Sequence, residues 1–208
     1  MMASSIARSM LLISSLLIMR GSEAAGSDIK DNFHIDARQA YQMKRDNPDD
    51  VLLIDIRTQA EMRYTGVADV IDANIPYRLD STTWKMKKDG KHGTYKRPKN
   101  PDFIEAVGNV FADKGKDKDT PVIVMCTNGT RAHYALKHLK KAGYTRVYAQ
   151  DEGFEGSKAK QGEDKGKRVV DGWKNRGLPW SYDLLPEKMY FNFDPQKRTD
   201  SDTSPKLS

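Results

Sequence analysis

Residues 121–131 read PVIVMCTNGTR, and this stretch decides the fold. The run from Val122 to Met125 is entirely apolar, which is typical of a strand buried on both faces of a parallel sheet. A polar segment follows, residues 126–131, which we call the cysteine loop. Apolar residues then recur at helical spacing, at Ala132, Ala135, Leu136 and Leu139. This order predicts an α/β domain, in which functional sites lie beyond the carboxyl ends of the strands.

The same alternation of strands and helices extends on both sides of this stretch. Residues 51–56 form a second apolar run and predict another buried strand. A capping-box pattern predicts a helix over residues 36–45, and Asn100-Pro101 precedes a further helical stripe. Shorter strands are expected at 33–35, 73–75 and 146–148. The sequence therefore predicts a mainly parallel sheet flanked by helices.

Residues 1–24 have the pattern of a secretory signal peptide. Arg8 precedes an apolar run over residues 10–19, and small residues follow before the expected cut. The apolar run is about half of the roughly 20 residues that a membrane-spanning helix needs. We therefore expect a periplasmic or secreted protein without stable membrane insertion.

The chain is basic, with a formal net charge of +6 over 208 residues. Its cations are mixed with Asp and Glu and no recognition motif accompanies them, so nucleic acid is not an expected partner. The most basic part is an insertion, residues 78–99, which we expect to be a loop. It interrupts a single domain predicted over residues 29–182, and residues 183–208 form a C-terminal extension expected to be disordered in part.

Cys126 is the only cysteine, so the chain alone can form neither a disulfide nor a multi-cysteine zinc site. We expect no metal and no cofactor. A thiol is a nucleophile only as the thiolate. Backbone N–H groups and a helix N-terminus can hold an anion, Gly129 permits the tight turn, and Arg131 adds a cation. Such a loop suits a thiolate, a persulfide anion or a bound oxyanion.

The pattern Cys-x-x-Gly-x-Arg after an apolar strand resembles the active-site loop of rhodanese-like sulfurtransferases. Three further segments agree with that family in order and spacing. They are Asp55-Ile56-Arg57 followed by Glu61, then Asn74-Ile75-Pro76, and the ending Gly177-Leu178-Pro179-Trp180. The resemblance covers residues 29–180.

This resemblance implies a rhodanese-like α/β fold, a mainly parallel five-stranded sheet flanked by helices. It also implies that Cys126 takes sulfane sulfur from thiosulfate, a persulfide or a polysulfide and passes it to a thiophilic acceptor. The donor or acceptor can be a small molecule or a protein. Cys126 and Arg131 would be catalytic, and Asp55, Arg57 and Glu61 would support the site. The expected substrate-binding residues are Thr127, Asn128, Gly129 and Thr130.

Two other functions remain open. The first is a persulfide-binding carrier or a sulfur sensor with little turnover of its own, which assays with small donors and acceptors would distinguish from an enzyme. The second is a Cys-dependent phosphatase, whose loop has five residues between Cys and Arg, whereas this loop has four.

Many rhodanese-like sulfurtransferases carry Arg or Gln at the position of Thr127. Because Thr127 is neutral, we expect weak use of the thiosulfate dianion by this protein.

Overall fold

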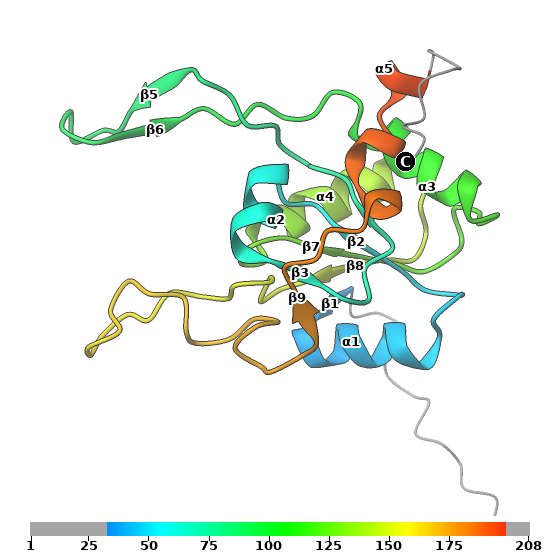
Figure 1. The fold of residues 1–208 in the computed structure, drawn as a ribbon, viewed down its shortest axis with the longest axis horizontal. Coiled ribbons are helices and arrows are strands. Elements are labelled where there is room, and N and C mark those ends of the chain that lie inside the picture. The colour runs from blue at the N-terminus through cyan, green and yellow to red at the C-terminus, as the bar shows by residue number, and fades with distance from the viewer. Residues whose placement is uncertain (1–32, 199–208) are drawn as a thin grey trace, which may run out of the picture. The chain divides into compact units, whose positions relative to one another are not determined.

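The structure is a computed structural model that describes residues 33–198. The predicted signal peptide, residues 1–24, lies outside the described residues. Five strands form the main sheet, and every neighbouring pair is parallel. In spatial order they are β1 (His34–Ile35), β8 (Val147–Gln150), β7 (Val122–Met125), β2 (Leu52–Asp55) and β4 (Ala73–Asn74) (Figure 1). The predicted five-stranded parallel sheet is confirmed.

Helices cover both faces of this sheet. In β7, Val122 and Val124 join one core cluster with α3 (Phe103–Asp113) and α4 (Thr130–Lys141). Ile123 and Met125 join a second cluster with α1 (Ala37–Asp46) and Met62 of α2 (Gln59–Thr65). Successive side chains of a strand point to opposite faces, which is why a strand buried on both faces is apolar throughout.

The insertion is a β-hairpin rather than the expected loop. Its strands, β5 (Trp84–Met86) and β6 (Gly93–Tyr95), lie side by side and pair antiparallel (Figure 1). Trp84 and Tyr95 are opposite each other and pack edge to face with ring centroids 5.3 Å apart. Each strand has only three residues, and both are largely exposed, so no apolar alternation marks them in the sequence.

Residues 183–198 also pack on the domain. Two short 3₁₀ turns, η1 (Pro186–Lys188) and η2 (Tyr190–Asn192), precede α5 (Pro195–Arg198). Tyr190 and Phe193 are buried in the core cluster of α3 and α4. A separate short pairing joins β3 (Val67–Ala68) to β9 (Trp180–Ser181). Within residues 33–198, no helix has the length and apolar character needed to cross a membrane.

Candidate active site

The cysteine loop begins where β7 ends and leads directly into α4. Met125, the last residue of β7, is in register with Asp55 of β2 and Gln150 of β8. Cys126 therefore lies at the carboxyl edge of the sheet, as the sequence predicts for a functional site. Its side chain is completely buried, with 0% exposure. The thiol is thus covered by protein in this conformation.

Two glycines allow a second loop, residues 151–153, to pack directly against the cysteine loop. Gly129 has φ +79°, and a Cβ there would come within 1.7 Å of the carbonyl oxygen of Asp151. Gly153 has φ +72°, and its Cβ would come within 2.2 Å of the Asn128 nitrogen. Both positions demand glycine, for their backbone conformation and for space.

The cysteine loop presents unused backbone N–H groups. Its first two carbonyl oxygens are occupied, since Phe154 N donates to the Cys126 carbonyl (2.6 Å) and Glu155 N to the Thr127 carbonyl (3.0 Å). In the part of the chain that the structure describes, no oxygen accepts a hydrogen bond from the N–H groups of residues 127–131. Gly129 is the N-cap of α4 and provides no side-chain cap. Free N–H groups at a helix N-terminus favour an anion.

Arg131 is held by Glu61 in a two-point ion pair. Arg131 Nη1 and Nη2 donate to the two carboxylate oxygens of Glu61 at 2.8 and 2.7 Å. Thr127 Oγ1 donates to Glu61 (2.9 Å) and accepts from Arg131 Nη2 (2.6 Å). Burial alone would raise the pKa of Glu61, but the hydrogen bonds and charge of Arg131 outweigh it and lower this pKa to about 2. The expected cation at the end of the cysteine loop is therefore already paired with a carboxylate of the protein.

Asp55 and Arg57 form a separate, fully buried ion pair. Arg57 Nε donates to Asp55 Oδ2 at 2.9 Å and Nη2 to the same oxygen at 2.6 Å, and both side chains are 0% exposed. The Arg57 guanidinium also lies 3.9 Å from the ring centroid of Phe154. Because the two charges are matched inside the protein, this pair offers no free charge to a ligand.

The insertion reaches the site through one residue that the sequence did not single out. Arg97 Nη1 donates to Glu61 Oε1 at 3.0 Å, so Glu61 contacts two guanidinium groups. The two residues are 36 positions apart, and only the basic composition of residues 78–99 hinted at such a contact. The Glu61 carboxylate is thus in contact with two positive charges, those of Arg97 and Arg131.

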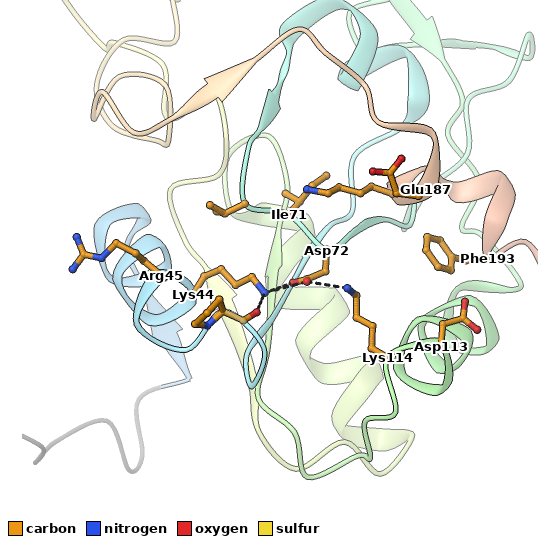
Figure 2. A pocket seen from close by; sticks show the side chains of 11 residues that line it. Lys44, Arg45, Ile71, Asp72, Asp113, Lys114, Glu187 and Phe193 are labelled. Atoms are coloured by element: carbon orange, nitrogen blue, oxygen red, sulfur yellow. Dashed lines mark hydrogen bonds and ion pairs between the residues drawn. The ribbon is translucent and has the colours of Figure 1, made fainter. Parts of the chain in front are cut away.

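A separate hollow lies at the opposite edge of the sheet, beside the start of β2. Figure 2 shows Lys44 and Lys114 converging on Asp72 there. Lys44 Nζ lies 2.9 Å from Asp72 and donates to the Val51 carbonyl at 2.8 Å, and the Lys44 and Asp72 side chains are 7% and 10% exposed. Asp72 also accepts from Leu53 N at 2.8 Å. These bonds join α1 to the sheet.

Residues 36–160 match the family model described as the rhodanese-like domain. The chain belongs to the rhodanese-like family. The rhodanese-like domain is similar to the crystal structure of Rv0390 from Mycobacterium tuberculosis, with 28% identity and a TM-score of 0.53. That match covers 72% of this chain and 97% of the other.

Sequence relatives agree with this assignment. An uncharacterized Rickettsia rickettsii homologue of RP600 is 26% identical over 149 residues, covering 72% of this chain and 97% of the relative. The thiosulfate sulfurtransferase GlpE of Actinobacillus pleuropneumoniae is 31% identical over 94 residues, covering 44% of this chain and 70% of the relative. The rhodanese-like domain thus belongs to a family that contains sulfurtransferases.

Proposed function

We propose that this rhodanese-like domain is an exported sulfurtransferase that carries sulfane sulfur on Cys126. The observation that supports the proposal most strongly is the placement of Cys126 before free N–H groups at the N-terminus of α4. Backbone N–H groups at a helix N-terminus can donate hydrogen bonds to an anion that is bound there. The family membership and the sulfurtransferase names among its relatives support the same reaction class.

The transfer has two half-reactions with one covalent intermediate. In the first, the Cys126 thiolate attacks the sulfane sulfur of the donor. A sulfur–sulfur bond forms and the bond within the donor breaks, so that thiosulfate would leave as sulfite and a persulfide as a thiol. In the second, a thiophilic acceptor attacks the outer sulfur and the Cys126 thiolate leaves. The loop N–H groups stabilise the anion at each stage.

The environment of Arg131 supports a persulfide donor over thiosulfate. Thiosulfate is a dianion, and Glu61 already neutralises Arg131. The side chains of Thr127 and Asn128 are neutral. A thiosulfate ion would have to compete with the Glu61 carboxylate for its cation, whereas a donor with less charge would not.

The burial of Cys126 favours a second candidate function, that of a persulfide carrier or sensor. A completely covered thiol must be uncovered before any donor reaches it. If a protein partner opens the site, turnover with small molecules alone will be slow. The phosphatase alternative receives no comparable support, because a loop of four residues between Cys126 and Arg131 forms a smaller cradle than phosphate requires.

A steady-state assay with thiosulfate or a persulfide as donor and cyanide as acceptor distinguishes the enzyme from the carrier. An enzyme will give sustained turnover that Cys126→Ser abolishes. A carrier will transfer one sulfur per chain and stop. Turnover that persists in Cys126→Ser would reject both functions.

A further inference from the structure

Three side chains from separate elements meet beside the cysteine loop. They are His34 in β1, His133 in α4 and Asp151 directly after β8. Asp151 Oδ1 lies 2.9 Å from His34 Nδ1 and 2.8 Å from His133 Nε2. The two imidazole rings pack edge to face, with centroids 4.8 Å apart. The proposed sulfur transfer uses none of these groups.

We propose that His34, His133 and Asp151 bind a divalent transition-metal ion, with Zn²⁺ as the best fit. The three donor atoms lie within 4.8 Å of one another. Bonds from Zn²⁺ to nitrogen and oxygen are about 2.0–2.2 Å long, so neighbouring ligands of a tetrahedral ion are about 3.3 Å apart. The two contacts with the carboxylate must each lengthen by about half an ångström, and the two ring nitrogens must approach each other by up to about 1.5 Å. Two imidazoles and one carboxylate form a recognised zinc ligand set.

Ion binding also requires a change of tautomer in both imidazoles. A carboxylate accepts hydrogen bonds and cannot donate them, so without an ion the ring nitrogens facing Asp151 carry the protons. To bind the ion, each of these nitrogens must release its proton and offer a lone pair. The proton of His34 is then on Nε2 instead of Nδ1, and that of His133 is on Nδ1 instead of Nε2. Both imidazoles stay neutral, and Asp151 offsets one of the two charges of the ion.

The site is open to solvent and continuous with the cysteine loop. The side chains of His34 and His133 are each 47% exposed and that of Asp151 is 41% exposed, so an ion can enter from water and keep a water ligand. One hollow contains part of the site together with loop residues, lined by Asn128, Gly129, Thr130, His133, Tyr134, Lys137 and Asp151. The backbone of Asp151 is the group that packs on Gly129. An ion would therefore tie β1, α4 and the 151–153 loop together beside the cysteine loop.

The hairpin supplies a matched control. His92 Nδ1 lies 3.0 Å from Asp89 Oδ2, so this exposed pair has the same chemistry with one imidazole fewer. Two ligands bind Zn²⁺ far more weakly than three. If His34, His133 and Asp151 only form hydrogen bonds with one another, replacing either histidine will change Zn²⁺ affinity no more than replacing His92.

The experiment is a Zn²⁺ titration by calorimetry of the chain without a polyhistidine tag, in a Cys126→Ser background so that the thiol does not compete. Visible absorption with Co²⁺ reports the coordination. We expect one ion per chain, a higher unfolding temperature with Zn²⁺, and at least tenfold weaker binding in His34→Ala and in His133→Ala. His92→Ala should bind as tightly as its parent.

Absence of binding in the parent, or unchanged affinity in either His34→Ala or His133→Ala, would overturn the proposal. Loss of affinity in His92→Ala would place the ion elsewhere and overturn it as well. Both histidines are surface side chains, so their truncation should leave the fold intact, and circular dichroism checks this. The proposal does not depend on sulfur transfer, because the binding assay needs no thiol at position 126.

Discussion

Both terminal nitrogens of Arg131 donate to the Glu61 carboxylate, at 2.7 and 2.8 Å. The Thr127 hydroxyl, in the cysteine loop, is hydrogen-bonded to both of these side chains. The residue expected to attract an anionic donor is thus engaged with an anion of the protein. Access to this cation therefore depends on displacing Glu61 from Arg131, and donor preference should follow from that competition.

Replacing Glu61 with Gln should improve thiosulfate use relative to a persulfide donor. The substitution frees the Arg131 charge, and one charge-assisted contact amounts to about 1.5–3 kcal/mol, or roughly ten- to a hundredfold in kcat/KM for thiosulfate. Glu152→Gln is the control, since Glu152 pairs with Arg176 and contacts no side chain of the cysteine loop. An equal loss with both donors in Glu61→Gln would instead assign Glu61 to positioning the loop.

Arg97→Ala should lower kcat/KM for thiosulfate by about threefold to tenfold, because it removes one of two cations near Glu61. The triple replacement of Lys85, Lys87 and Lys88 by Ala should change it little, since within residues 33–198 no side-chain hydrogen bond or ion pair joins these lysines to Glu61 or the cysteine loop. Salt should reduce the effect of Arg97→Ala. Sensitivity to the three lysines but not to Arg97 would contradict this account.

The acid stability of the domain should reflect the Glu61 carboxylate. Arg131 holds its pKa at about 2, below the ordinary value of 4.5. A lowered pKa in the folded state adds stability above the unfolded-state pKa, and this stability disappears as the pH falls from about 4.5 toward 2. Denaturant unfolding of the wild type and Glu61→Gln should therefore give free energies that converge over this range. A constant difference between them would show that ionisation of Glu61 contributes nothing.

Gly129→Ala should destabilise the domain by more than about 3 kcal/mol or prevent the cysteine loop from forming. Gly162→Ala is the matched control, because Gly162 has a similar φ of +76° but no atom within 4 Å of its Cβ position. The control should cost only about 1 kcal/mol, the price of the backbone conformation alone. Similar losses in the two variants, measured by urea unfolding, would mean that the contact with Asp151 is unimportant.

The sequence predicted the structure best where the signal is local. The apolar run of β7, the loop after it and the spacing of apolar residues in α4 all lie within about twenty positions, and they identify both the parallel sheet and the position of Cys126. The capping box of Asp36 and Gln39 is likewise present. Short-range patterns of this kind follow directly from backbone geometry.

Contacts between distant positions were not predictable in the same way. Glu61 and Arg131 are 70 positions apart, and His34 and Asp151 are 117 apart. No periodicity links such residues, because their meeting depends on the order of strands in the sheet. The burial of Tyr190 and Phe193 was missed as well, since the hydrophobic cluster MYFNF, residues 189–193, is too short to show the period of a helix or a strand.

The central claim is that Cys126 carries sulfur, and mass spectrometry of the intact protein tests it most directly. After incubation with thiosulfate or a persulfide donor and removal of the excess, we predict a mass increase of one sulfur atom in the wild type. Cyanide should remove that sulfur, and Cys126→Ser should never acquire it. A wild-type chain that gains no sulfur from either donor, or a Cys126→Ser chain that gains it equally, would contradict the account.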